Sequence, residues 1–152
     1  SVTGTGEVLT NWEELKRKEK GQATNTDALD AVARSLPALW RAEKVQKKAK
    51  KAGFDWPDIS GALDKLSEAL EELKTAVAQG TNVEEALGDL LFSAVNVSRF
   101  LKADPEVALG KATDKFISRF AKVEALAAAQ NQAMEGMTLE ELDKLWERAK
   151  ET

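Results

Sequence analysis

Apolar residues recur along the chain at steps of three and four, which is the spacing of an α-helix, rather than alternating as in a half-buried strand. The pattern predicts an all-helical protein. A first amphipathic helix is expected over residues 7–20, followed by a polar loop over 22–27. Ser35 and Pro37 are residue types typical of a helix N-cap and first turn, so the next helix is expected over 35–51.

Two long helices are expected in the middle of the chain. Leucines at heptad-like spacing predict a helix over residues 59–79, which ends at Gly80. Asn82 can cap a following helix over 83–101, whose apolar residues leave little face for solvent. We therefore expect this second helix to lie at the centre of the fold.

The last third of the chain is also expected to be helical. One helix is predicted over residues 104–130, and Thr138 with Glu141 forms a capping-box pattern for another that ends near residue 150. Five or six helices in one bundle result. No linker is long enough to divide them, so residues 1–152 are predicted to form a single domain.

Composition narrows the possible chemistry. The chain has 152 residues, 43% of them apolar, and contains neither cysteine nor histidine. Disulfides, thiolate nucleophiles, imidazole bases and the usual zinc sites are therefore excluded. The 22 basic and 26 acidic residues are interspersed and give a net charge of -4, which does not favour nucleic-acid binding. No apolar run is long enough for a membrane span and no signal peptide is visible, so a soluble cytoplasmic protein is expected.

Acidic residues occur on both central helices. Asp89, Ser93 and Asn96 form a polar stripe on an otherwise apolar helix, and the preceding helix carries Glu68, Glu71 and Glu72. A short turn makes the two helices antiparallel neighbours, so their carboxylates could converge on Mg2+, which prefers oxygen ligands. The alternative is that the glutamates are solvated and that Asp89 pairs with a lysine or arginine.

Four short segments then occur together in a fixed order. They are RSLPAL (34–39), KKAKKAGFDW (47–56), LGDLLF (87–92) and KFISRF (115–120). The combination resembles the C-terminal domain of the MazG nucleoside triphosphate pyrophosphohydrolases, and the resemblance covers nearly the whole chain. It implies an all-α MazG-like bundle, usually a homodimer, that uses magnesium to hydrolyse nucleoside triphosphates to the monophosphate and pyrophosphate.

The chain departs from that family at the expected metal ligands. The resemblance implies a motif Glu-Glu-x-x-Glu on one helix and Glu-x-x-Asp on the next, with four acids as ligands. Here Ala69 and Ala86 occupy two of these positions, which leaves Glu72 and Asp89. Because Mg2+ depends on anionic oxygens, this loss is expected to weaken or abolish the site. Glu68 is the third catalytic candidate, since it or Glu85, or a metal that arrives with the triphosphate, could restore function.

Further residues are candidates for binding the substrate. Lys115 and Arg119 lie four apart on one helical face and match basic positions of the family, so they are candidates to contact phosphate; the alternative is a solvated basic face. Lys47 belongs to a basic run that could attract a polyanion or simply form a solvated face. Asn96 on the polar stripe and Trp56 in a turn complete the set, although Trp56 is more simply an anchor of that turn.

Other substitutions suggest two alternatives to an impaired hydrolase. Trp40, Thr113 and Ile117 differ from the family pattern and, with the two alanines, would make the pocket more apolar. Glu43 could then act as a base in a reshaped pocket for a different small molecule. A non-catalytic module that binds nucleotide or dimerises is the other alternative. Natural divergence and engineering both remain open as the origin of the alanines.

Overall fold

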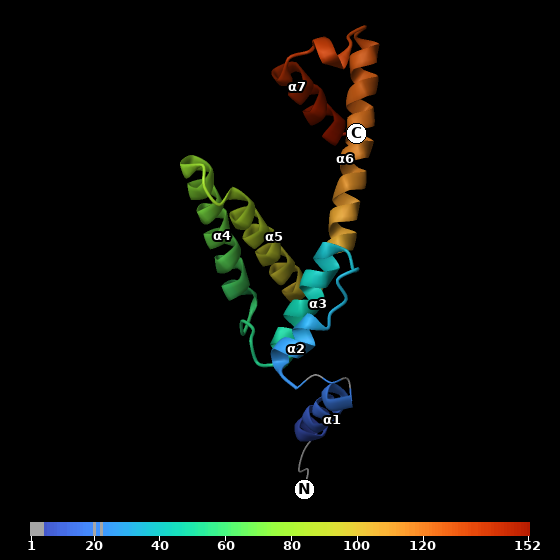
Figure 1. Cartoon of the computed structure of the whole chain (residues 1–152). Coiled ribbons are helices and arrows are strands. Elements are labelled where there is room, and N and C mark those ends of the chain that lie inside the picture. The colour runs from blue at the N-terminus through green and yellow to red at the C-terminus, as the bar shows by residue number, and fades with distance from the viewer. Residues whose placement is uncertain (1–4, 20, 22) are drawn as a thin grey trace. The chain divides into compact units, whose positions relative to one another are not determined.

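A computed structural model describes residues 5–19, 21 and 23–152 (Figure 1). These residues form helices and no strand, which confirms the all-helical prediction. The elements are α1 (Thr5–Glu19), α2 (Asn25–Asp30), α3 (Ala38–Lys51), α4 (Ile59–Gln79), α5 (Val83–Phe100), α6 (Pro105–Ala129), the 3-10 helix η1 (Met134–Gly136) and α7 (Leu139–Lys150). None of the helices described is long and apolar enough to cross a membrane. The chain divides into two compact units, residues 1–106 and 107–152.

The first unit is built on a hairpin of α4 and α5, the most extensively packed pair of helices (Figure 1). α3 packs on α5, and α2 packs on α3. Gly80 ends α4 in the left-handed conformation at φ 68°, which glycine adopts without the steric cost paid by other residues. The next helix begins one turn later, so the carboxylates that follow on α5 lie beside the last turns of α4.

Small residues form the buried face of α4. Ala62, Ala69 and Ala76 are spaced seven apart and are at most 8% exposed, while Val95 on α5 is 2% exposed. Positions seven apart share one side of a helix, and small side chains there let two helices approach closely. The centre of this unit is therefore a close helix pair rather than a core of large side chains.

The prediction that α5 is enclosed by the fold is wrong for this chain by itself. Leu87 is 45% exposed and Leu91 is 51% exposed, although Val95 and Val97, further along α5, are buried. The apolar residues of α5 thus exceed what α3 and α4 cover.

Several helix boundaries differ from the prediction. The predicted loop over 22–27, of which residue 22 lies outside the described residues, contains the start of α2. Thr24 caps that helix, because its hydroxyl accepts from the Asp27 N–H at 3.1 Å and its own N–H donates to the Asp27 carboxylate at 3.0 Å. α1 is described to Glu19, and residue 20 of the predicted first helix lies outside the described residues.

The third helix also begins later than expected. Pro37 itself occupies the N-cap position of α3, with φ -50° and ψ 140°. A proline disfavours helical backbone in the residue before it, here Leu36, which explains why the helix does not extend back to Ser35.

The second unit is a helical hairpin closed by η1. Its buried core is formed by the end of α6 and by α7 and consists of Val123, Ala127, Leu145 and Ala149. Thr138 caps α7 by accepting a hydrogen bond from the Glu141 N–H at 3.2 Å, as predicted. The Glu141 carboxylate accepts from the Thr138 hydroxyl, so its return bond differs from that of a full capping box.

Candidate functional site

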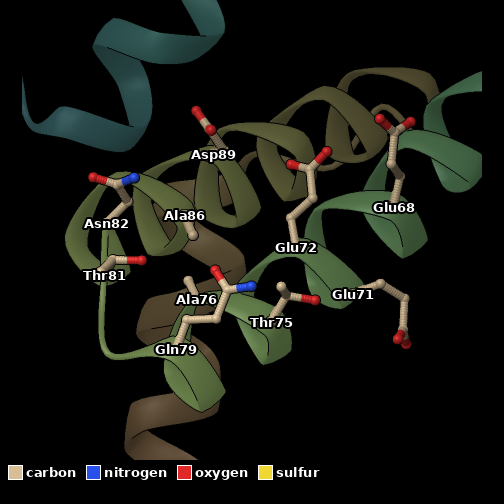
Figure 2. Close-up of a pocket in the computed structure, with 10 residues that line it drawn as sticks. All are labelled: Glu68, Glu71, Glu72, Thr75, Ala76, Gln79, Thr81, Asn82, Ala86 and Asp89. Atoms are coloured by element: carbon tan, nitrogen blue, oxygen red, sulfur yellow. The ribbon is translucent and has the colours of Figure 1, made fainter.

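A pocket of about 450 Å³ lies at the turn end of the α4–α5 hairpin (Figure 2). We call it the acidic pocket because four of its lining residues are acidic. It is lined by Glu68, Glu71, Glu72, Thr75, Ala76, Gln79, Thr81, Asn82, Ala86 and Asp89. The hairpin therefore brings acids of both helices to one place, as the short turn at Gly80 predicts.

The acids of this pocket differ in orientation. Glu68, Glu72 and Asp89 point to the same side of the hairpin, whereas Glu71 points away from it (Figure 2). Glu71 is bound by Lys74 at 3.0 Å, three residues along α4. Glu68 is bound in the same way by Lys65, at 3.2 Å. Both pairs are exposed, so they stabilise the helix only weakly.

The two alanines at expected ligand positions have different surroundings. Ala86 lines the acidic pocket close to the turn, where it presents a methyl group in place of a carboxylate (Figure 2). Ala69 is 2% exposed and belongs to the buried alanine stripe of α4. It does not line the pocket. A glutamate at 69 would have to extend its carboxylate out of the helix interface to reach the pocket.

The residues present do not fit a protein-held magnesium ion. Among the residues that the structure describes, no group of three or more acidic side chains is placed to hold a metal. Glu72 and Asp89 are both exposed, and the methyl group of Ala86 offers no oxygen. Glu68 is engaged with Lys65, so it does not supply the missing ligand in this arrangement.

The polar stripe of α5 is less uniform than its sequence suggests. Asp89 is exposed, so its carboxylate keeps its contact with solvent. Ser93 is 8% exposed. Asn96 is half-buried, and its side-chain oxygen accepts a hydrogen bond from Arg99. The stripe thus runs from solvent at the acidic pocket into a polar network at the other end of the helix.

That network was not predicted from the sequence. Arg99 binds Asp55 through both terminal nitrogens, at 2.7 and 3.3 Å, and its Nε donates to the Gln46 side chain at 3.2 Å. The side chains of Arg99 and Asp55 are 6% and 11% exposed. Gln46 in turn donates to the Phe92 carbonyl at 3.0 Å. The hydrogen bonds from Arg99 lower the pKa of Asp55 below its ordinary value, although desolvation acts in the opposite direction.

A second pocket of about 390 Å³ lies beside this network. We call it the aromatic pocket, since three aromatic rings line it together with the polar network. Its lining residues are Leu29, Val45, Gln46, Ala49, Gly53, Phe54, Asp55, Trp56, Phe92, Asn96 and Arg99. The predicted candidates Trp56 and Asn96 are therefore brought together, away from the acidic turn. The signal for this pocket in the sequence was the Phe54-Asp55-Trp56 turn, which was interpreted mainly as an anchor.

The remaining candidates of the first unit have local partners. The Lys47 ammonium donates to the Glu43 carboxylate at 2.8 Å, one helical turn away. The Trp40 indole N–H donates to Asp104 at 2.8 Å. Trp40 thus ties the start of α3 to the segment before α6, and Glu43 serves as an ion-pair partner.

The candidates in the second unit lie on α6. Arg119 lies over the ring of Trp146 at 5.9 Å, and Lys115 is exposed one turn earlier. The Thr113 hydroxyl donates to the Leu109 carbonyl of its own helix at 2.9 Å, and Ile117 is 60% exposed. The two cations therefore share a helical face, as their spacing predicts.

Comparison with known proteins identifies relatives that are similar to this chain in sequence. No protein-family model matches the chain. The nucleoside triphosphate pyrophosphohydrolase of Escherichia coli K12 is 41% identical over 154 aligned residues, which cover 99% of this chain and 59% of that protein. The Thermotoga maritima protein named nucleoside triphosphate pyrophosphohydrolase/pyrophosphatase MazG is 45% identical over 139 residues, covering 91% of this chain and 54% of that protein.

A third relative has no assigned activity in its name. The uncharacterized protein YabN of Bacillus subtilis is 44% identical over 154 residues, which cover 99% of this chain and 31% of that protein. The chain thus spans somewhat more than half the length of its E. coli and T. maritima relatives. Along nearly all of its own length, it is similar to proteins named nucleoside triphosphate pyrophosphohydrolases.

Proposed function

We propose that this chain is a nucleoside triphosphate pyrophosphohydrolase scaffold whose hydrolytic reaction is impaired. The similarity to the E. coli and T. maritima proteins supports the reaction class, in which water cleaves a nucleoside triphosphate into the monophosphate and pyrophosphate. The observation that carries the impairment is Ala86, whose methyl group lies in the acidic pocket with Glu72 and Asp89. Ala69 removes a second acid from the α4 side.

Charge explains why two acids are not enough. Glu72 and Asp89 are anions, and by themselves they repel the triphosphate. Magnesium supplied by the solution would neutralise that charge when bound, but Glu72 and Asp89 are the two acids that remain of the four implied by the family motif to hold it. We therefore expect turnover well below that of a chain with all four acids, and at best a metal that enters with the substrate.

We further propose that basic residues provide the affinity for phosphate. Lys115 and Arg119 share one face of α6, and the Arg119 fork can bind two phosphate oxygens at once. Lys47 retains an exposed ammonium group despite its pair with Glu43, with 58% of its side chain accessible. Replacing Arg119 by Gln should weaken triphosphate binding more than the same change at Lys47, because Lys47 is partly neutralised by its partner.

The test is to restore the acids. Pyrophosphate release from a panel of nucleoside triphosphates is measured with Mg2+ for the parent chain and for variants carrying Ala86→Glu, Ala69→Glu and both. The double variant is expected to exceed the parent by at least about a hundredfold, the usual order for a lost group that stabilises developing charge. The control is the double variant with Asp89→Asn, which should return to the parent rate.

The outcomes separate the two parts of the proposal. Equal activity of parent and double variant contradicts the impairment. Absence of activity in both, with the fold retained, contradicts the reaction class. We also propose that the chain acts as a homodimer, because apolar residues on α4 and α5 are left exposed.

A further inference from the structure

The aromatic pocket has features of a ligand site that the packing of the fold does not account for. Phe54 lines it and is 82% exposed, which is unusual for a phenylalanine. The backbone beneath this ring is fixed, since the Phe54 N–H donates to the Ala49 carbonyl at 3.0 Å and the Gly53 N–H donates to the Lys50 carbonyl at 2.8 Å. The backbone therefore places Phe54 at the pocket, although its ring is not buried.

A second ring is held in place from behind. The Trp56 indole packs on Gly61 of α4 so closely that a Cβ atom at 61 would come within 2.8 Å of the ring. The indole is nevertheless 43% exposed and lines the pocket. Phe92 on α5 is 46% exposed and completes the aromatic lining. An indole held against α4 and two further rings with free surface suit a flat ligand that can stack.

The polar wall of the pocket restricts the charge and the hydrogen-bonding groups that a ligand can have. Arg99 is neutralised by Asp55, so the wall offers no net charge to an anion or a cation. Because a guanidinium only donates, the Asn96 side chain must turn its oxygen toward Arg99. Its amide N–H groups make no hydrogen bond to the described residues, so they are available as donors. The pocket therefore suits a neutral, flat ring with an acceptor atom.

The position of the aromatic pocket relative to the acidic pocket indicates what kind of flat ring it binds. Asp89, Phe92 and Asn96 lie at steps of three and four, on one face of α5. Seven residues of helix separate Asp89 from Asn96, a distance of about 10 Å along the axis. This is comparable with the span from the base to the phosphates of a nucleotide. The two pockets thus lie along one helix face at a separation suited to its two ends.

We infer that the aromatic pocket binds the nucleobase, with Phe54 and Trp56 stacking on it and the Asn96 amide donating to a ring or carbonyl acceptor. The inference rests on the proposed function, because that function supplies the nucleotide. The inference goes beyond that function because it assigns base recognition to a second pocket, which is lined by none of the residues of the acidic pocket and by neither alanine.

The experiment uses nucleosides without phosphate or metal, so that it is independent of hydrolysis. The chain has four tryptophans, and the indole N–H signal of Trp56 can be assigned in an NMR spectrum by comparison with Trp56→Phe. Titration with nucleosides at millimolar concentration is expected to shift the Trp56 signal and leave that of Trp12 unchanged. Inorganic tripolyphosphate should not shift the Trp56 signal.

Variants then test the assigned contacts. Phe54→Ala should weaken nucleoside binding about tenfold, in line with the loss of one stacked ring. Asn96→Asp keeps an oxygen for Arg99 but loses the donor, and should weaken binding by a similar factor. The matched control is Leu139→Ala in the second unit, since Leu139 is also 82% exposed but lines neither pocket. It should bind nucleosides as the parent does.

Three results would overturn the inference. One is that nucleosides do not shift the Trp56 signal, and another is that neither variant changes the affinity. The third is that Phe54→Ala changes the oligomeric mass in light scattering, which would make the pocket a contact between copies. Absence of pyrophosphate release from the Ala69→Glu and Ala86→Glu double variant would instead contradict the proposed function. The nucleoside titration does not depend on hydrolysis, so the two failures can be told apart.

Discussion

Among the described residues, the pair between Arg99 and Asp55 is the most buried ion pair. Arg99 also binds Gln46 and Asn96, so one guanidinium fixes the loop after α3 to two helices. Both members of the pair are largely buried. Removing one partner of a buried pair leaves the other charge buried and uncompensated. The resulting loss of folding free energy is larger than the net stabilisation that the pair provides.

We therefore predict that Asp55→Asn lowers the free energy of unfolding by about 3 kcal/mol at neutral pH. The folded-state pKa of Asp55 lies below its unfolded value, so this contribution is complete above the unfolded pKa and is lost as the pH falls through the folded-state pKa. Thermal unfolding from pH 7 to pH 3 should show the parent and variant midpoints converging below about pH 4. Glu71→Gln, which breaks an exposed pair, should change stability little at any pH, and equal effects of the two variants would contradict the prediction.

Single residues of the candidate site also differ in how far the sequence predicts their positions. Periodicity and a short turn place Glu72, Ala86 and Asp89 around one pocket, because these relations are local to a helical hairpin. The contact of Arg99 with Asp55 joins residues 44 apart and follows no period, so it could not be predicted. The burial of Ala69 depends on how closely α4 and α5 approach, which is also a property of the tertiary structure.

At the scale of the elements, the interior of α4 is constrained by one close contact with an aromatic ring. An ideal Cβ atom at Gly61 would lie 2.8 Å from Cε3 of Trp56, whereas nothing lies within 4 Å of the corresponding position at Gly110 in α6. Neither glycine has a positive φ, so both positions accept helical backbone with a side chain. The two sites differ only in the space available.

We predict opposite effects of alanine at these two positions. Gly61→Ala should destabilise the chain by about 1–3 kcal/mol, the usual cost of overpacking, because the indole ring cannot move by rotation of a flexible tail. Gly110→Ala should stabilise it by about 0.5–1 kcal/mol, since alanine is a better helix former. Urea denaturation of both variants measures the difference. A stabilising Gly61→Ala would show that Trp56 is not held against α4.

The helices themselves were largely predictable, and their ends less so. The glycine that ends α4 and the threonine that caps α7 are local signals, and both act as predicted. α2 was missed because Thr24 and Asp27 form a capping box in a segment that is polar throughout and has no apolar period. The predicted start of α3 is misplaced because Ser35 was interpreted as the cap, although Pro37 restricts the backbone of Leu36 between them.

In the whole molecule, apolar residues on α4 and α5 are left exposed to solvent by the packing of the chain itself. α4 exposes Leu63, Leu70 and Val77, each seven residues from the next and 42–62% accessible. Such a spacing forms one continuous stripe along the helix. α5 adds Leu87 and Leu91, at about half exposure. Contiguous apolar surface of this kind is typical of protein–protein interfaces.

A second copy of the chain is the partner that these stripes suit best, because two antiparallel helices with matching stripes can pack against each other across a twofold axis. We predict that light scattering after size-exclusion chromatography gives twice the mass of one chain. Leu91→Glu should shift the equilibrium to the monomer, since burying an unpaired carboxylate at the interface costs several kcal/mol. Gln132→Glu adds the same charge in an exposed loop of the second unit and should leave the dimer intact. A monomeric parent, or a dimeric Leu91→Glu variant, would mean that these stripes are not covered by a second copy.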